Sequence, residues 1–304
     1  MDTNIKISVR DIRKDECRLI AELLANGLGY QPEIFWLMLY QIGNRPKLEK
    51  YPQYGLVLED NGRIVGTILT IYSRITHSLP EQVRCHLTGW WVEPGYTLYA
   101  ALLAKVATKY TEVTYINVSA RPHTYKIIEA QGFRRYARGQ FLVLCPLHLL
   151  DQMHLFDQKN DAAIFVHDGP PPQAHRPAEL EMMDLHAKYG CVCLWGTVNG
   201  EAYPLIFRRR NFKGVWPGAE VIFCRDASDL KTFAGPLSRY FLKRGIAVFS
   251  IDANGAYAGL KGRYFDGVEP RFYKGTPPSL GDLAFTLNAM IPFTRHSASK
   301  AGSH

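Results

Sequence analysis

The sequence predicts two tandem α/β domains with mixed sheets of the α+β kind. The chain has 304 residues, which is too many for one ordinary core and suits two domains of roughly 120 to 150 residues. Helix-like and strand-like segments alternate through both halves. The pattern at 99–105 recurs at 233–239, which is 134 residues later. A duplicated domain explains this spacing, and a chance match between two unrelated α/β domains is the alternative.

The composition indicates a globular protein with an anionic ligand. Hydrophobic residues make up 47% and charged residues 21%, which is close to average soluble usage and excludes a disordered chain. The formal charge of +8 suits a nucleotide, coenzyme A or nucleic acid. The basic residues stand in short separate groups, as at 134–135 and 208–210, and no helix-turn-helix or RNA-binding signature is visible. We therefore expect no nucleic acid partner.

The apolar runs are too short for a membrane span. No run approaches the roughly 18 residues that crossing a bilayer requires, and residues 1–10 lack the apolar stretch of a signal peptide. We therefore expect a cytoplasmic protein without a membrane span.

The cysteines lack the paired spacing of a zinc site. Only Cys191 and Cys193 stand close together, in an apolar strand-like run, and no second pair completes a tetrahedral site. We expect buried thiols and no metal. The six residues are Cys17, Cys85, Cys145, Cys191, Cys193 and Cys224.

The elements of the first half follow from periodicity and turn residues. Apolar residues at helical spacing predict helices at 17–27 and 35–42, and Pro46 stops the second. Two β-rich runs flank Asp60-Asn61-Gly62, a strong hairpin signal. The predicted strands lie at 5–11, 54–59, 64–72, 83–92, 113–118 and 141–145, and further helices at 99–110 and 123–131.

A junction separates the halves at 146–178, where the run Gly169-Pro170-Pro171-Pro172 cannot continue a helix or a central strand. Beyond it the order of elements recurs. Helices are predicted at 178–189, 230–244 and 282–291, and strands at 191–198, 202–207, 220–224, 246–252 and 263–273. We therefore divide the chain into a first domain at 1–147, a linker at 148–178, a second domain at 179–293 and a disordered tail at 294–304.

The most informative segment is 90–103, where a strand ends in Pro94-Gly95 and turns directly into an apolar helix. Backbone amides at such a helix start can bind phosphate. With Val92, Pro94 and Tyr96, the segment resembles the GNAT superfamily of acyl-CoA-dependent acyltransferases, in which V-x-P-x-Y leads into a pyrophosphate loop of the type Q/R-x-x-G-x-G/A. The resemblance implies a coenzyme A or acyl-CoA donor held by Trp91, Val92, Gly95, Tyr96, Thr97, Tyr99, Ala100 and Ala101.

Two residues of this loop depart from the family pattern. Thr97 and Ala100 stand where Arg or Gln and Gly are expected. Small residues still let a backbone approach the pyrophosphate. The alternative is an ordinary strand-to-helix turn.

A second segment resembles the same family. Residues 115–119 and 127–133 match its strand, helix and Y-x-x-x-G-F ending, and the resemblance adds Asn117, Ser119 and His123 to the donor site. Ile128 stands where the family often has the tyrosine that protonates the leaving thiolate. Tyr125, one turn earlier, is our candidate general acid, and a packing role is its alternative.

The resemblance implies direct attack of an amine on the thioester, helped by positioning and by a backbone amide of the fourth strand. The general base should face the cleft between the fourth and fifth strands. Alternation places His86, Thr88 and Trp90 on one face of strand 83–92, and His86 is the good base among them. A structural histidine, or His123 as the base, is the alternative.

The second domain is predicted to be degenerate. Asp226 and Asp229 at the helix entry would repel pyrophosphate and suit helix capping. Arg208, Arg209 and Arg210 are candidate contacts to an anionic acceptor, although a solvated hairpin end is the commoner meaning of such a run.

The combined prediction is an acyl-CoA-dependent N-acyltransferase. Within the family, the two-domain build resembles enzymes that acylate nucleotide-linked amino sugars, our preferred acceptor class. N-acyl amino acid synthesis and a coenzyme A-binding regulatory module without turnover are the alternatives. Acyl chain length and oligomeric state stay open.

Overall fold

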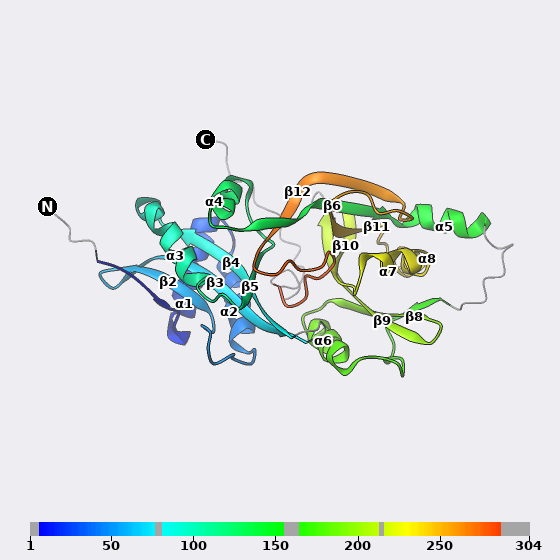
Figure 1. Cartoon of the computed structure of the whole chain (residues 1–304), viewed down its shortest axis with the longest axis horizontal. Coiled ribbons are helices and arrows are strands. Elements are labelled where there is room, and N and C mark those ends of the chain that lie inside the picture. Colours follow the sequence, from blue (N-terminus) through cyan, green and yellow to red (C-terminus); the bar gives the residue numbers. More distant parts are fainter. Residues whose placement is uncertain (1–5, 77–80, 155–163, 213–215, 287–304) are drawn as a thin grey trace. The chain divides into compact units, whose positions relative to one another are not determined.

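The chain divides into two units in the computed structural model, which describes residues 6–76, 81–154, 164–212 and 216–286 (Figure 1). Among the described residues, unit 1 comprises 6–134 and Tyr273–Thr276, and unit 2 comprises Arg135–Phe272 and 277–286. The tail predicted at 294–304 and the end of the helix predicted at 282–291 lie outside the described residues. The expected α/β class with mixed sheets is confirmed.

Unit 1 joins its strands in the order β1-β2-β3-β4-β5. Neighbouring strands are antiparallel except β4 and β5, which are parallel. Its elements are β1 (Ile7–Asp11), η1 (Lys14–Glu16), α1 (Cys17–Leu28), α2 (Pro32–Gly43), β2 (Gly55–Asp60), β3 (Arg63–Ile75), β4 (Gln82–Val92), η2 (Pro94–Tyr99), α3 (Ala100–Ala107), β5 (Val113–Asn117), η3 (Pro122–Thr124) and α4 (Tyr125–Ala130). The later segment Tyr273–Thr276 returns to β5, where the Thr276 amide donates to Thr114 Oγ1 at 3.1 Å.

Unit 2 joins its strands in the order β12-β6-β11-β10-β9-β8-β7. Here β10 and β11 form the parallel pair. Its elements are β6 (Arg134–Leu144), α5 (Cys145–His154), β7 (Phe165–His167), α6 (Pro177–Lys188), β8 (Val192–Val198), β9 (Glu201–Phe212), β10 (Trp216–Phe223), α7 (Ala227–Thr232), α8 (Ala234–Leu242), β11 (Val248–Ala253) and β12 (Gly262–Lys274).

The hairpin predicted at Asn61-Gly62 is present, and a second Asn-Gly turn joins β8 to β9. Asn61 and Gly62 have φ angles of 48° and 85°, and Asn199 and Gly200 have 51° and 80°. Two consecutive positive φ angles match the right-handed twist of the flanking strands, and Asn followed by Gly adopts them at low cost. This turn chemistry explains β2–β3 and β8–β9.

The 134-residue spacing holds for the strand register. Unit 1 pairs Arg84↔Thr114, Cys85↔Tyr115 and His86↔Ile116, and unit 2 pairs Gly218↔Val248, Ala219↔Phe249 and Glu220↔Ser250. Each residue of the second set follows its counterpart by 134 positions. Two unrelated domains with the same order of elements would not need to share this register, so duplication is the better explanation.

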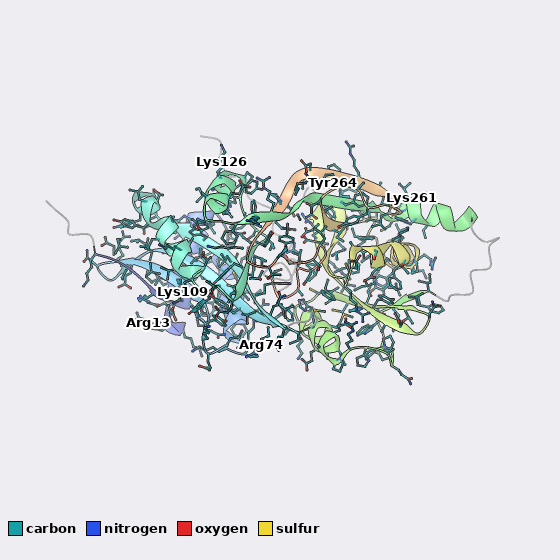
Figure 2. The ribbon with its side chains drawn as sticks, viewed as in Figure 1. Arg13, Arg74, Lys109, Lys126, Lys261 and Tyr264 are labelled. Atoms are coloured by element: carbon teal, nitrogen blue, oxygen red, sulfur yellow. The ribbon has the colours of Figure 1, made fainter. Side chains whose placement is uncertain are left out.

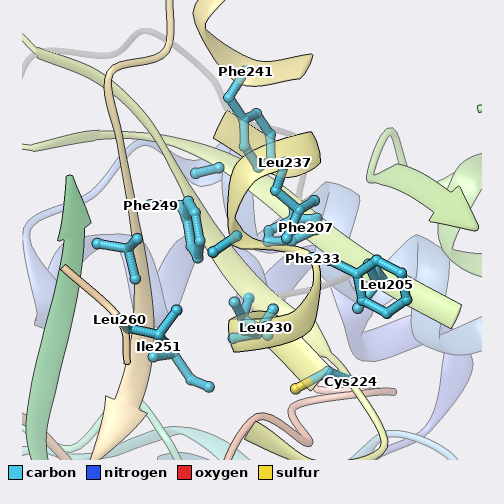
Figure 3. Packing of buried hydrophobic residues seen from close by; sticks show 14 of the residues in the cluster. Leu205, Phe207, Cys224, Leu230, Phe233, Leu237, Phe241, Phe249, Ile251 and Leu260 are labelled. Carbon is cyan, nitrogen blue, oxygen red and sulfur yellow. The ribbon is translucent and has the colours of Figure 1, made fainter. Parts of the chain in front are cut away.

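One face of the unit 2 sheet packs against α7 and α8. Phe207, Phe241 and Phe249 meet there, with ring centroids 4.9 to 5.7 Å apart (Figure 3). Edge-on and tilted contacts of this kind add to the free energy of burying the rings. Four of the predicted buried thiols are confirmed, at Cys17, Cys85, Cys145 and Cys224, whereas Cys191 and Cys193 are half-buried.

Three of the predicted helices differ from the observed ones near a proline. The helix predicted at 99–110 is preceded by the 3-10 helix η2, which begins at Pro94, and α3 ends at Ala107. The helix predicted at 230–244 is two helices, α7 and α8. Pro236 lacks an N–H and would disrupt a helix interior, but it is tolerated in the first turn of a new helix. The helix predicted at 123–131 likewise opens as η3 and ends at Ala130.

Four further segments differ from the prediction. The strand predicted at 141–145 begins at Arg134, and that predicted at 202–207 continues to Phe212. The described part of the helix predicted at 282–291 is not helical, since Asp282 forms a β-bridge with Phe223 and Phe285 has a φ of 61°. The segment predicted as the linker 148–178 contains the end of α5 and the strand β7.

Basic side chains are spread over several elements of unit 1. Figure 2 labels Arg13, Arg74, Lys109 and Lys126, which belong to different parts of that unit. All four are exposed. The positive charge of unit 1 is therefore distributed, as the sequence predicts, and not gathered on one helix.

Candidate active site

The parallel pairing of β4 with β5 stops midway along β4. It extends from Val83↔Val113 to His86↔Ile116. Beyond that point β4 continues to Val92, whereas β5 ends at Asn117. Within the described residues, positions 87–92 of β4 thus have no strand on the β5 side, and we call this stretch the open edge of β4. Its backbone groups can hydrogen-bond to an extended ligand.

A bulge in β4 changes the face that its last residues occupy. Thr88 pairs with Leu69 of β3 and Trp91 pairs with Thr67, so β4 holds one extra residue between them. Gly89 accommodates the bulge with a φ of 53°. Trp91, not Trp90, therefore shares the face of Thr88, which corrects the alternation expected from the sequence.

His86 lies where the pairing with β5 ends. It pairs with Ile71 on β3 and Ile116 on β5 and is buried, with 1% of its surface exposed. Thr88, on the same face, is also buried. His86 is therefore the last residue of β4 before the open edge.

The turn after β4 is held by the β2–β3 hairpin. Arg63 Nη1 donates to both carboxylate oxygens of Glu93, at 2.8 and 2.9 Å. The Tyr96 hydroxyl donates to Asp60 Oδ2 at 2.7 Å, and the Arg63 guanidinium lies over the Tyr96 ring. Arg63 Nη2 also donates to the Tyr96 hydroxyl at 3.3 Å, so one guanidinium contacts both Glu93 and Tyr96 of the turn. The Tyr96 hydroxyl is thus hydrogen-bonded to the hairpin. Tyr96 would therefore influence a bound donor by holding the turn in place.

The remaining predicted donor residues surround this turn. Gly95, Thr97 and Ala101 are exposed, whereas Trp91, Val92, Tyr99 and Ala100 are half-buried. The first turns of η2 and α3, which lie wholly within the described residues, carry no acidic side chain. The carboxylate of Glu93, the N-cap residue of η2, directly precedes this turn, and its pairing with Arg63 offsets the repulsion that it would exert on an anion at these helix starts.

The residues predicted after β5 are divided between core and surface. Asn117 is buried, and its Oδ1 accepts a hydrogen bond from the Ser119 amide at 3.2 Å. Ser119 and His123 are exposed, and Tyr125 is the half-buried first residue of α4. Ile128 is a core residue with an apolar side chain. It therefore cannot donate a proton to a leaving thiolate.

The end of α1 is contacted from both sides of the open edge. The Trp91 ring of β4 packs on Gly27. From the β5 side, Arg121 Nη2 donates to the Leu28 carbonyl at 2.9 Å, and its guanidinium lies over the Tyr30 ring. Arg121 and Tyr30 are not among the residues predicted from the sequence, because neither belongs to a motif. The signal that could have pointed to Arg121 is its position before Pro122, at a helix start.

In unit 2, two of the three predicted acceptor arginines belong to a charge network. Arg208 and Arg210 form ion pairs with Glu220, and Arg210 also bonds to Glu269 at 2.7 Å. Arg271 Nη2 donates to Glu220 Oε1 at 2.7 Å. A solvated hairpin end is therefore excluded for two of the three residues. Arg209, on the opposite face of β9, is exposed.

The network holds Glu220 ionised in a buried position. Burial would raise the pKa of Glu220, but the positive charges of Arg208, Arg210 and Arg271 lower it to about 2. Burial raises the pKa of Asp252 above its ordinary value, against the attraction of Arg271. The carboxylates and guanidinium groups of this network therefore pair with one another, as buried charges must.

Two further searches bear on the site. Among the described residues, no three His, Cys, Asp or Glu side chains gather as metal ligands would. No helix in the described part of the chain is long and apolar enough to cross a membrane.

Comparisons with known proteins identify the fold. No protein-family model matches the sequence, and no curated protein matches it either. Among solved structures, a GCN5-related N-acetyltransferase from Anabaena variabilis is similar, with a TM-score of 0.56, 7% identity and coverage of 88% of this chain and 72% of that one. A GCN5-related N-acetyltransferase from Kribbella flavida has a TM-score of 0.53, 9% identity and coverage of 88% and 71%.

Proposed function

We propose that this chain, which has the fold of the GCN5-related N-acetyltransferases, transfers an acyl group from acyl-CoA to an amine and holds the donor in unit 1. The observation that carries the proposal is the open edge of β4 beyond His86↔Ile116. This edge leads directly into the turn at Pro94 and the start of α3. An extended amide-containing donor arm would pair with the edge, and its phosphates would lie at the turn.

The residues of the turn fit a pyrophosphate. A methyl group placed on the Gly95 α-carbon would meet no atom within 4 Å, so the backbone there is open to a close ligand. Ala100 and Ala101 keep the first turn of α3 small and uncharged. The net charge of +8 favours the approach of an anionic donor. Thr97, Asn117, Ser119 and His123 complete the proposed donor contacts.

The proposed reaction is a direct displacement. The amine nitrogen attacks the thioester carbonyl carbon, a C–N bond forms, the C–S bond breaks, and the thiolate takes up a proton. His86 accepts the proton that the amine loses, directly or through water. Tyr125 is the proposed donor of the proton to the thiolate, because Ile128 cannot supply one.

The acceptor class rests on charge alone. We retain an amino sugar linked to a nucleotide, because a second anionic ligand suits a chain of net charge +8. Arg208 and Arg210 are paired with Glu220, so Arg209 is the arginine of this run that could contact a diphosphate. Amino acids are the competing acceptors.

A coenzyme-binding module without turnover is the second candidate. Ile128 in the core, in place of a tyrosine, favours it. The deciding experiment measures thiol release from acetyl-CoA and longer acyl-CoAs, with and without nucleotide-linked amino sugars or amino acids. Release stimulated by an amine supports the transferase. Binding without any release supports the module, and absence of binding by calorimetry contradicts both.

A further inference from the structure

Residues 281–283 of unit 2 add a short strand to the edge of β10. The Cys224 amide donates to the Gly281 carbonyl at 3.0 Å, and the Leu283 amide donates to the Ile222 carbonyl at 2.7 Å. Phe223 and Asp282 face each other between these two bonds as an antiparallel bridge. This pattern is that of a β-ladder with a single rung.

The added strand lies on the side of β10 that faces β11. A methyl group on the Gly281 α-carbon would stand 2.6 Å from Cys224 Sγ and 3.4 Å from Ile251 Cδ1, so Gly281 is close to both β10 and β11. The pairing between those two strands ends at Glu220↔Ser250. Residues 281–283 therefore occupy the edge of β10 beyond that pair, and the chain passes beside Cys224 in Figure 3.

The segment after Gly281 is fixed by its own contacts. Leu283 and Ala284 are buried. The Phe285 amide donates to His186 Nε2 of α6 at 3.1 Å, and the two rings are 5.2 Å apart. Phe285 also has a φ of 61°, which a non-glycine residue adopts only when its surroundings hold it there. Burial, this hydrogen bond and this backbone conformation thus hold the segment in a defined position in unit 2.

The same edge is open in unit 1. The pair His86↔Ile116 corresponds to Glu220↔Ser250 at the 134-residue spacing. By the same spacing Thr88 corresponds to Ile222 and Trp90 to Cys224. In the described residues of unit 1, nothing pairs with β4 there as residues 281–283 pair with β10.

We propose that residues 281–283 fill the donor edge of unit 2 with the chain's own backbone, so that each chain binds one acyl-CoA, in unit 1. This inference rests on the proposed function of unit 1. A ligand that pairs through its amides would have to displace two hydrogen bonds and the buried Leu283 and Ala284 to reach β10. Asp226 and Asp229 at the start of α7 would also repel its phosphates.

Two measurements on the full-length chain test the proposal. Calorimetry with acetyl-CoA should give one site per chain, and Ala100→Glu in unit 1 should weaken that site without revealing another. Hydrogen exchange should show protected amides at Cys224 and Leu283. Gly281 has a positive φ, and a methyl group on its α-carbon would lie too close to Cys224 Sγ. Gly281→Ala should therefore speed exchange at both amides at least about tenfold. Gly255→Ala is the control, since a methyl group there meets no atom within 4 Å.

The outcomes separate this proposal from the proposed function. Two acetyl-CoA sites per chain, or a site that persists unchanged in Ala100→Glu, would overturn the assignment of the donor to unit 1 alone. Rapid exchange of both amides in the parent protein would overturn the added strand. If the parent binds no acetyl-CoA, the proposed function fails and the assignment of a single donor site fails with it. Exchange at Cys224 and Leu283 then decides only whether the added strand forms.

Discussion

The Trp91 ring lies directly on Gly27, so that a methyl group on the Gly27 α-carbon would stand 2.2 Å from ring atom Cε2. This contact joins the end of β4 to the end of α1. Because the neighbouring Leu28 carbonyl accepts a hydrogen bond from Arg121, the same end of α1 is tied to both sides of the open edge. Gly27 is thus a position where the absence of a side chain sets the site geometry.

Gly27→Ala should lower the free energy of unfolding by about 1 to 3 kcal/mol, because an added methyl group overpacks a filled space. Urea unfolding followed by circular dichroism measures the change. Asn26→Ala, at an exposed position of the same helix, should stay within about 0.5 kcal/mol of the parent. Gly27→Ala/Trp91→Leu should recover part of the loss. A single variant as stable as the parent would show that the ring moves aside at no cost.

Ala100→Glu should weaken acyl-CoA binding by at least about 2 kcal/mol, since it places a carboxylate beside the proposed pyrophosphate position. Isothermal titration calorimetry with acetyl-CoA gives the change in Kd. Ala187→Glu, at an exposed position of α6 in unit 2, adds the same charge and should leave Kd unchanged. Equal affinity in both folded variants would remove the donor from the start of α3.

His86→Gln should lower kcat by roughly 100-fold with little change in donor Kd, the scale expected for loss of a general base. His123→Gln, at an exposed residue of η3, should change donor affinity more than kcat. A His86 variant that keeps the parent's rate and pH profile would assign proton removal to solvent or to His123.

Arg271→Met should destabilise the protein by about 3 to 5 kcal/mol, because it leaves Glu220 and Asp252 as buried carboxylates without that partner. Thermal or urea unfolding measures the loss. Arg209→Met, on an exposed part of β9, should have little effect. Arg271→Met with Glu220→Gln and Asp252→Asn should regain stability, since the uncompensated charges are removed. No recovery would mean that packing of the arginine, not its charge, is what matters.

Glu16 should make the free energy of unfolding depend on pH in the acidic range. The hydrogen bond from Arg10, opposed by burial and helped by the Arg13 amide, lowers the pKa of Glu16 from 4.5 to about 2. The unfolded chain therefore binds more protons between these values, so the contribution of Glu16 is complete above pH 4.5 and is lost as pH falls toward 2. Urea unfolding at pH 6 and pH 3 should show a smaller pH difference for Glu16→Gln than for the parent. An equal difference would contradict the assignment.

Only those features of the site that depend on residues adjacent in the sequence could be predicted from the sequence. The Asn-Gly turns and the Pro94-Gly95 exit from β4 depend on neighbouring residues, and both are present. The bulge at Gly89 was not predicted, since an extra residue in β4 is defined only by its pairing with β3. Arg121 and Tyr30 were missed for a similar reason, because their contact joins segments far apart in the chain.

The arginine run shows the same limit in unit 2. Its charge is visible in the sequence, but its meaning depends on Glu220 of β10 and on Glu269 and Arg271 of β12. Burial makes an ion-pair network out of residues that would otherwise be solvated. The exposed Arg209 differs from its neighbours only through the alternation of β9.

The sequence by itself predicted the α/β class, the 134-residue spacing of the repeat and the turn that ends β4, because periodicity, spacing and turn residues are local properties. Only the tertiary structure decided that the pairing of β4 with β5 stops at His86↔Ile116 and that residues 281–283 add to β10. These features depend on hydrogen bonds between strands, and such bonds join segments whose proximity no local pattern encodes.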